Sequence, residues 1–371
     1  MKRIALLGST GSIGVSTLRV LARHPDAFTL VALVAGSNQA RLAEQVGVWK
    51  PRYAGLVGGN GDSSFATGPE TLIEAATRDD VDIVINAVVG AAGLDATLAA
   101  LRAGKRVALA NKETLVTAGP LVAEAAREGG GEVVPIDSEH SAVLQCLVAQ
   151  GAAPSRLILT ASGGPFRTWS REQLERATVA EALNHPTWQM GAKITVDSAT
   201  LANKALEVIE AHFLFGLGYD AIEVIVHPQS IVHAFVEFSD GSVLAQVGFP
   251  SMEVPILYAL THPDRLTDNG VRRFDPVAAG ALSFEPVRTE CFGAFELGVA
   301  AGRKGGTAPA VFNAANEVAV AAFLDGRITF GRIPAVIEGA LRRHDDVGTI
   351  TLDAVRAADA AARRHAGEAV A

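Results

Sequence analysis

A glycine-rich turn near the N-terminus constrains the fold of this chain more than any other feature. The motif G-x-x-G-x-x-G fills residues 8–14, between an apolar run at residues 2–7 and a helical pattern at residues 15–23. Glycines let a backbone approach a pyrophosphate closely, and the unpaired N–H groups of the following helix favour an anion. We interpret the turn as a variant dinucleotide fingerprint; the alternative is a tight glycine turn that binds no ligand.

Strand patterns alternate with helical patterns after this turn. Strands are predicted at residues 28–35, 54–57, 83–86, 106–109 and 132–136, and helices at residues 37–48, 69–77, 94–103 and 115–128. This strict alternation predicts a doubly wound, mostly parallel sheet.

The pattern changes after Asp137. Further strands are predicted at residues 157–161, 222–226, 230–238 and 242–249, with a hairpin signal at Asp240-Gly241. They predict an α+β region with an antiparallel or mixed sheet, followed by a Pro-rich linker and alanine-rich helices. We therefore expect an α/β protein with a Rossmann-like domain at 1–136, an α+β catalytic domain at 137–261, a linker at 262–287 and a C-terminal α-helical domain at 288–371.

Charge and cysteine content exclude several classes of protein. The 371 residues include 32 basic and 40 acidic side chains, and the net charge of −8 disfavours nonspecific binding to nucleic acid. Cys146 and Cys291 lie far apart, so we expect neither a disulfide framework nor a cysteine-based metal site. The apolar run at residues 4–7 is too short for a signal peptide, and no stretch is long enough to span a membrane. A cytoplasmic protein is expected.

The end of the second predicted strand indicates which dinucleotide the turn binds. An NAD enzyme usually places Asp or Glu there for the ribose 2′-hydroxyl, and this chain has neither. Ser37, Asn38 and Arg41 can instead hydrogen-bond a 2′-phosphate, which favours NADP. Residues 111–113 follow a later strand and are expected at the ligand crevice. The alternative is an ordinary helix start with Asn111 as its cap.

Acidic residues predict a metal site. Asp137 and Glu139 follow the strand at 132–136, and an extended backbone would point both side chains the same way. Two close carboxylates repel unless a cation or a proton lies between them. With Glu207 they form an oxygen set that suits Mg²⁺ or Mn²⁺. Taken alone, a D-x-E pair is more often a solvated strand end.

The segment 197–215 is predicted to be one helix with a polar face. That face contains four residues at helical spacing, namely Thr200, Asn203, Lys204 and Glu207. Ser198 is expected at the helix entrance, where free N–H groups favour an anion. A phosphate at the start and a metal further along would use these groups; the alternative is a capped, salt-bridged surface helix.

Two loops add polar groups. The Ser162-Gly163-Gly164-Pro165 loop follows a predicted strand and offers N–H groups and a hydroxyl to an anion. Residues 185–191 combine His, Trp and Met between chain breakers and are interpreted as a lid. The alternative is a loop whose Trp and Met pack onto the core.

Together these segments resemble the 1-deoxy-D-xylulose 5-phosphate reductoisomerase family. The matching stretches are GSTGSIG, ANKETLV, PIDSEHSA, ASGGPF, HPTWQMGAKITVDSATLANKALEVIEA, HPQSIVHAFVEFSDGS and GGTAPAVFNAANEVAV. The resemblance implies a homodimeric enzyme that uses NADPH and one divalent ion per subunit. Its reaction would rearrange and reduce 1-deoxy-D-xylulose 5-phosphate to 2-C-methyl-D-erythritol 4-phosphate in the non-mevalonate isoprenoid precursor pathway.

The resemblance also implies a role for each site residue. The implied NADPH contacts are Thr10, Gly11, Ser12, Ile13, Gly36, Ser37, Asn38, Asn111, Glu113 and Gly191. The implied metal ligands are Asp137, Glu139 and Glu207. The implied substrate contacts are Lys112, Ser138, Glu139, Ser162, His185, Ser198, Asn203, Lys204 and Glu207. The three metal ligands and Lys112, which would polarise the reacting hydroxyl or aid proton transfer, are the implied catalytic residues. Some members of the family have a basic residue where Ser37 stands.

Two other functions are compatible with parts of this pattern. Another two-domain NADP oxidoreductase, such as a semialdehyde or homoserine dehydrogenase, would not need the three carboxylates. The semialdehyde enzyme needs a catalytic cysteine, whereas Cys146 lies in an apolar helical pattern and Cys291 near the end of the linker. A non-catalytic NADP sensor would be expected to have lost a metal ligand or a phosphate contact, and none is missing.

Overall fold

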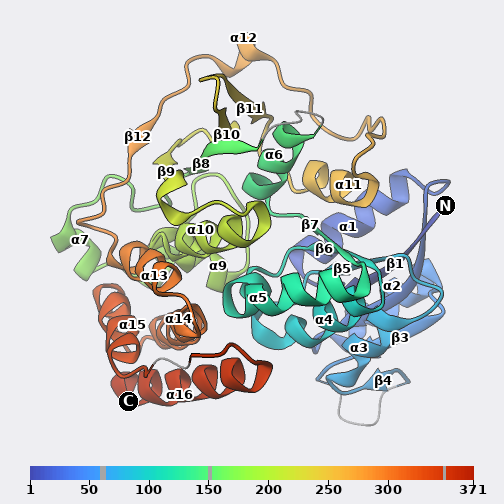
Figure 1. Ribbon diagram of the computed structural model, residues 1–371, viewed down its shortest axis with the longest axis horizontal. Helices are drawn as coiled ribbons and strands as arrows, with labels where there is room; N and C mark the ends of the chain where they lie inside the picture. Colours follow the sequence, from blue (N-terminus) through green and yellow to red (C-terminus); the bar gives the residue numbers. More distant parts are fainter. Residues whose placement is uncertain (59–63, 149–152, 346–347) are drawn as a thin grey trace. The chain divides into compact units, whose positions relative to one another are not determined.

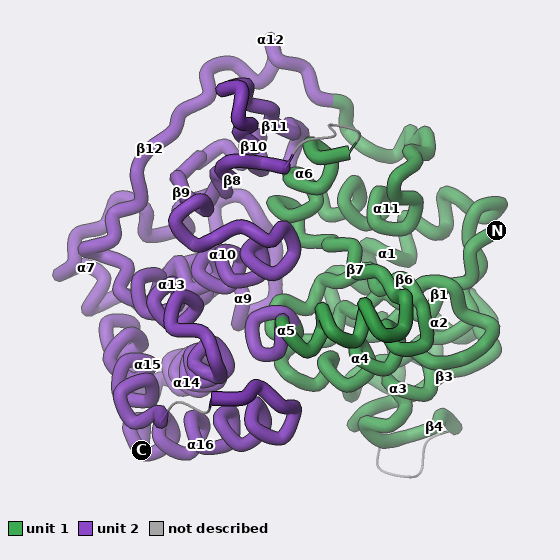
Figure 2. Tube along the Cα trace, in the orientation of Figure 1, with its two compact units in different colours: residues 1–114, 120–148, 251–273 green, residues 115–119, 149–250, 274–371 purple. Residues whose placement is uncertain are grey.

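The chain divides into two compact units in the computed structural model, which describes residues 1–58, 64–148, 153–345 and 348–371 (Figures 1 and 2). Unit 1 comprises Met1–Thr114, Pro120–Val148 and Ser251–Arg273, and unit 2 comprises Leu115–Gly119, Ala149–Pro250 and Phe274–Ala371. The three-domain division expected from the sequence stays a prediction.

Unit 1 is built on a seven-stranded sheet in the order β4-β3-β2-β1-β5-β6-β7. Its strands are β1 (Lys2–Leu7), β2 (Phe28–Ala35), β3 (Tyr53–Leu56), β4 (Ala66–Thr67), β5 (Ile83–Asn86), β6 (Arg106–Leu109) and β7 (Glu132–Pro135). All pairings are parallel. Residues 4–7 of β1 and all of β5 are buried, as expected for central strands covered on both faces. The predicted doubly wound parallel sheet is confirmed, and the short β4 is an addition to it.

Helices cover this sheet. They are α1 (Ser12–Arg23), α2 (Gln39–Trp49), α3 (Glu70–Thr77), α4 (Leu94–Arg102), α5 (Lys112–Gly129), α6 (Ser138–Leu147) and α11 (Glu253–Thr261), with a 3₁₀ turn at Gly90–Gly93. Although α11 is remote in sequence, its Ile256 and Leu260 share one apolar core with Ile4 and Leu6 of β1. The return of the chain at 251–273 therefore completes unit 1.

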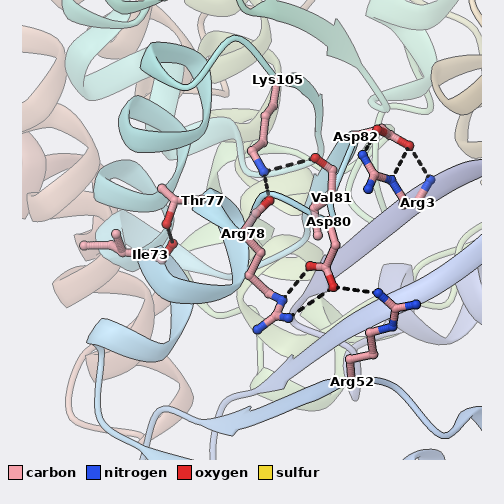
Figure 3. A network of polar contacts seen from close by, with 9 residues as sticks. All are labelled: Arg3, Arg52, Ile73, Thr77, Arg78, Asp80, Val81, Asp82 and Lys105. Carbon is pink, nitrogen blue, oxygen red and sulfur yellow. Dashed lines mark hydrogen bonds and ion pairs between the residues drawn. The ribbon is translucent and has the colours of Figure 1, made fainter.

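A polar network joins loops and strands at the N-terminal end of the sheet (Figure 3). The buried ammonium of Lys105 donates to the carbonyl oxygens of Arg78 and, at 3.0 Å, Val81, beyond the end of α3. Burial lowers the pKa of Lys105. Asp82 accepts two hydrogen bonds from the Arg3 guanidinium, at 2.7 and 3.1 Å. These contacts account for the polar residues at the end of the sheet opposite the glycine turn.

Unit 2 contains a five-stranded mixed sheet in the order β11-β10-β8-β9-β12. Its strands are β8 (Pro154–Ala161), β9 (Ile222–Val226), β10 (Val232–Phe238), β11 (Val243–Val247) and β12 (Glu285–Pro286). Strands β8 and β9 pair in parallel and the other neighbours are antiparallel. The mixed sheet and its hairpin are as predicted, whereas β12 lies in the segment expected to be a linker.

The helices of unit 2 share one core, except for the short helix at Pro276–Ala279, which has no buried residue. They are α7 (Arg171–Glu175), α8 (Val179–Ala182), α9 (Ala192–Ala199), α10 (Ala202–Phe215), α12 (Pro276–Ala279), α13 (Gly293–Lys304), α14 (Ala308–Leu324), α15 (Ile333–Arg342) and α16 (Leu352–Val370), with 3₁₀ turns at Tyr219–Ala221 and Phe330–Arg332. Ala205 and Ile209 of α10 belong to the same apolar cluster as Phe312 of α14. A Cβ on Gly298 of α13 would lie 2.5 Å from the Cβ of Ala205, so this glycine permits the close approach of α13 to α10. No helix in the described ranges has both the length and the apolar content of a membrane span.

Two local predictions are wrong. The segment 197–215 is not one helix, because the chain breaks between α9 and α10 at Leu201, whose φ is 57°. Ser198 therefore lies in the last turn of α9 rather than at a helix entrance. The strand before Asp137 does not continue either, because α6 begins at Ser138. Glu139 thus lies in the first turn of a helix, where its charge suits the helix dipole.

Candidate functional site

The glycine turn of unit 1 has the geometry of an anion cradle. Gly8 has a φ of 86°, and a Cβ there would lie 2.4 Å from the carbonyl oxygen of Ala87. A Cβ on Gly14 would lie 2.4 Å from the carbonyl oxygen of Gly8, so this glycine lets α1 pack closely on the turn. Gly11 is the N-cap of α1, which leaves the N–H groups of Ser12 and Ile13 in the unpaired first turn.

Two asparagines organise the loops that follow β2 and β6. The side-chain oxygen of Asn38 accepts a hydrogen bond from the Arg41 N–H at 3.1 Å and caps α2. Asn111 caps α5 in the same way, through the Thr114 N–H at 3.1 Å. Its amide also donates at 2.8 Å to the carbonyl oxygen of Val88 and, at the same distance, to that of Gly90. Asn111 therefore caps α5, and the same side chain fixes the loop after β5.

A charged group lies at the starts of α5 and α6. The Lys112 ammonium forms a hydrogen-bonded ion pair with the Asp137 carboxylate, and the two side chains are 9% and 14% exposed. The Ser138 hydroxyl donates to the Glu139 carboxylate at 2.5 Å. Lys112, Asp137 and Glu139, which the resemblance assigned to chemistry, thus gather at the carboxyl edge of the parallel sheet, where open α/β sheets bind their ligands.

The serine-glycine loop of unit 2 approaches α9. Gly164 has a φ of 65°, and a Cβ there would lie 2.7 Å from the carbonyl oxygen of Ser198. The Gly164 N–H donates to the Ser162 hydroxyl at 3.2 Å. Because Gly164 permits this contact, the hydroxyls of Ser162 and Ser198 come close together although the two residues are far apart in sequence.

His185 joins these two serines. Its Nε2 lies 3.0 Å from the Ser162 hydroxyl and 3.1 Å from the Ser198 hydroxyl. The backbone N–H groups of Thr187 and Trp188 both donate to Nδ1, at 3.1 and 2.9 Å. Since Nδ1 accepts, the proton of the neutral ring is on Nε2, which faces the serines. Burial lowers the pKa of His185 to about 4, so the ring is a neutral hydrogen-bond donor at pH 7.

This burial predicts a pH-dependent loss of stability. The pKa of His185 is about 4 in the folded protein and near 6.5 in the unfolded chain, so its contribution is complete above pH 6.5 and is lost as pH falls toward 4. The difference in melting temperature between the wild type and His185→Gln should therefore shrink over this range. Thermal melts at pH 7.5, 6, 5 and 4.5 measure it. A difference that stays constant with pH would contradict the buried neutral ring.

The first turns of α10 carry three linked polar side chains. The Glu207 carboxylate accepts a hydrogen bond from Asn203 Nδ2 at 2.5 Å and from Lys204 Nζ at 2.7 Å. Glu207 is 1% exposed and Lys204 is 5% exposed. The predicted polar face therefore exists, but it points into the protein, which argues against an ordinary solvated surface helix.

Thr200 and Asp197 have structural partners that the sequence motifs do not predict. The Thr200 hydroxyl donates to the Asp197 carbonyl oxygen at 3.2 Å and accepts from the Ala202 N–H at 3.3 Å, so it bridges the break between α9 and α10. Asp197 is a buried carboxylate with partners on two helices. Its signal in the sequence is the i, i+4 spacing from Lys193, with which it pairs.

Gly191 is exposed and is the N-cap of α9.

Three segments of the chain match models of one protein family. Residues 4–119 match 1-deoxy-D-xylulose 5-phosphate reductoisomerase, residues 133–215 match the C-terminal domain of that enzyme, and residues 247–365 match a DXP reductoisomerase C-terminal domain. A protein of this name from Heliobacterium modesticaldum is 51% identical over 383 residues, an alignment that covers 100% of this chain and 98% of the relative. The chain belongs to the 1-deoxy-D-xylulose 5-phosphate reductoisomerase family. The family predicted from the sequence motifs is confirmed.

Other members of the family agree over the full length. The reductoisomerase of Bacillus cereus strain Q1 is 48% identical and covers 100% of both chains. A crystal structure of DOX-P reductoisomerase in complex with NADPH, fosmidomycin and magnesium superposes with a TM-score of 0.95 at 40% identity, covering 100% of this chain and 98% of the other. The Zymomonas mobilis enzyme in complex with NADPH has a TM-score of 0.91 at 40% identity, covering 100% and 99%. These structures confirm the predicted α/β fold.

Proposed function

We propose that this protein rearranges and reduces 1-deoxy-D-xylulose 5-phosphate to 2-C-methyl-D-erythritol 4-phosphate, with NADPH as the reductant and Mg²⁺ or Mn²⁺ as the metal. Membership of the reductoisomerase family carries the proposal. The glycine turn of unit 1 and a set of buried and half-buried polar donors in unit 2 support it.

NADPH would occupy the end of unit 1 where the glycine turn lies. The relevant residues are Thr10, Gly11, Ser12, Ile13, Gly36, Ser37, Asn38, Asn111 and Glu113, together with Gly191 of unit 2. A side chain at Gly8 or Gly14 would collide with neighbouring backbone, so only glycine permits this tight turn. The turn leads into the free N–H groups at the start of α1, which suit a pyrophosphate. Ser37 and Asn38 are exposed after β2 and are suited to a 2′-phosphate because no acidic side chain stands there.

The metal would be held by three carboxylates, those of Asp137, Glu139 and Glu207. An all-oxygen, anionic set suits a hard divalent cation. When bound, the ion supplies Lewis-acid stabilisation of negative charge on the substrate oxygens. Lys112 and Lys204 each pair with one of these carboxylates and offset part of their charge. Lys112 would also polarise the reacting hydroxyl of the substrate or aid a proton transfer.

The substrate phosphate would bind to hydrogen-bond donors of unit 2. They are the hydroxyls of Ser162 and Ser198, the Nε2–H of His185, the Asn203 amide and the Lys204 ammonium. Charge-assisted hydrogen bonds to a phosphate are stronger than those between neutral groups. Phosphate binding far from the reacting carbons would hold the substrate in register, while residues 185–191 exclude water. Ser138 would contact the substrate from unit 1.

One assay tests the proposal. The purified protein is mixed with Mn²⁺, NADPH and 1-deoxy-D-xylulose 5-phosphate, and the loss of NADPH absorbance is followed. Substrate-dependent oxidation that stops when EDTA is added supports the proposal, and its absence overturns it. Repeating the assay with NADH in place of NADPH tests whether Ser37 and Asn38 bind the 2′-phosphate. A preference for NADH would contradict that role.

We also propose a homodimer formed through the sheet of unit 2. Strand β11 is an edge strand, and its Val243, Leu244 and Val247 are 49%, 37% and 40% exposed. An exposed apolar edge is a site for pairing with another chain.

Location in the cytoplasm remains a prediction.

The edge strand predicts the effect of a charge on assembly. The 38.5 kDa chain should behave as a particle of twice that mass in light scattering, and Leu244→Glu should shift it toward the monomer mass. Val48→Glu is the matched control, because Val48 is a 76% exposed valine on α2 of unit 1. An unchanged mass for Leu244→Glu, or an equal shift for the control, would rule out this interface.

A further inference from the structure

A buried carboxylate stands directly before Ser198 in α9. Asp197 is 1% exposed, and its Oδ1 accepts a hydrogen bond of 2.8 Å from Nδ2 of Asn316, which lies on α14 and is 0% exposed. The other oxygen of Asp197 is 2.9 Å from the ammonium of Lys193, one turn earlier on α9. One carboxylate therefore connects the start of α9, its last turn and a helix more than a hundred residues away in sequence.

The surroundings of this contact are apolar. Val196 and Ala199 of α9 share a core cluster with Ala315 and Ala319 of α14. Apolar contacts would suffice to hold the two helices together, and burying a charge among them is costly unless it is paired. A hydrogen bond between buried groups is directional, however, whereas contacts between small alanines permit sliding. The polar pair thus restricts the position of α9 along α14 in a way that the alanines do not.

The position of α9 matters because Ser198 is the next residue. Its hydroxyl lies 3.1 Å from His185 Nε2, and Gly164 of the serine-glycine loop packs against its carbonyl oxygen. Lys193 lies two residues after Gly191, at the end of the segment interpreted as a lid. A shift of α9 would therefore move a phosphate donor and the end of the lid together.

We propose that Asn316 is a positioning residue, which acts through Asp197 to hold the Ser198 hydroxyl where it binds the substrate phosphate. This inference rests on the proposed function, since it assumes that Ser198 contacts the phosphate. It adds a residue of the C-terminal helices to the substrate site without any direct contact with the substrate.

The test compares Asn316→Leu with Asn313→Leu. Asn313 lies one turn earlier on α14, is also 0% exposed and donates to Glu317 rather than to Asp197. Both variants lose a buried amide, so both should melt at a lower temperature. Only Asn316→Leu should raise KM for 1-deoxy-D-xylulose 5-phosphate, by roughly tenfold or more, because small displacements of a binding group are costly. KM for NADPH should stay within about twofold in both.

A reciprocal exchange tests whether the hydrogen bond itself is responsible. In Asp197→Asn/Asn316→Asp the amide and the carboxylate change places, and KM for the substrate should return to within roughly threefold of the wild-type value. Equal KM in the two leucine variants, or no recovery in the exchange, overturns the proposal. If the leucine variants do not fold, Asn316→Ser and Asn313→Ser make the same comparison. A wild type without turnover would instead refute the proposed function.

Discussion

Replacing Glu207 with Gln is expected to lower kcat/KM by on the order of a thousandfold and to leave NADPH binding within about twofold. The substitution keeps the size of the side chain but removes the charge that would hold the metal ion. Asn203 and Lys204 donate to different oxygens of Glu207, at 2.5 and 2.7 Å. Glutamine keeps one acceptor oxygen, which can serve Lys204, and its NH2 group can donate to Asn203 once the Asn203 amide turns over to present its oxygen. The fold of α10 should therefore survive, and the loss should fall on metal-dependent chemistry.

The measurements separate these two effects. Turnover is assayed over a range of Mn²⁺ concentrations, and NADPH binding is measured by fluorescence titration without substrate. Glu210→Gln is the matched control, because Glu210 lies one turn later on α10 and is also buried at 4% exposure. A Glu207→Gln enzyme that keeps its Mn²⁺ dependence, or that loses NADPH binding equally, would contradict the assignment of Glu207 to the metal.

The sheets could be predicted from sequence because their signals are local. The central strands β1 and β5 are short, mainly apolar runs. The turn after β1 has no room for a Cβ at Gly8 and Gly14, and the glycines of the G-x-x-G-x-x-G motif mark these positions. The same holds for the hairpin between β10 and β11, whose Asp-Gly turn is a short-range signal.

The break at Leu201 could not be predicted in this way. A leucine at positive φ is disfavoured, and the residues around it favour helix, so local patterns predict continuation. The structure shows what compensates the strain: Leu201 is 1% exposed and packs in a small apolar cluster with Ala161 and Phe292. Both partners are distant in sequence. As a consequence, the sequence pattern puts Ser198 at the start of a helix, whereas it lies in the last turn of α9.

The sequence around Asp137 fits two local structures. An acidic residue at position 137 followed by Ser138 and Glu139 is also the pattern of a helix start with negative charge in its first turn. Because the strand β7 comes directly before Asp137, the local pattern also predicts alternation along a continuing strand. The carboxylates of Asp137 and Glu139 lie close together, as alternation along a strand also predicts, and only the backbone that presents them differs.

Lys204→Met is expected to raise KM for 1-deoxy-D-xylulose 5-phosphate by about a hundredfold, because a charge-assisted hydrogen bond to a buried phosphate contributes roughly 1.5–3 kcal/mol. Lys204 is 5% exposed, and its ammonium donates to the Glu207 carboxylate, which is one of the proposed metal ligands. If the phosphate recruits Lys204, substrate binding also releases Glu207 for the ion. Metal and substrate should then bind cooperatively.

A substrate without the phosphate separates this role from a structural one. The wild type and Lys204→Met are compared with 1-deoxy-D-xylulose 5-phosphate and with 1-deoxy-D-xylulose at saturating Mn²⁺ and NADPH. The variant should lose most of the preference for the phosphorylated compound, while the weak turnover of the unphosphorylated one changes little, because that compound never used the ammonium. An equal loss with both compounds would mean that Lys204 acts mainly by stabilising the buried charge of Glu207, and the phosphate would then have to be held by Ser162, Ser198, His185 and Asn203.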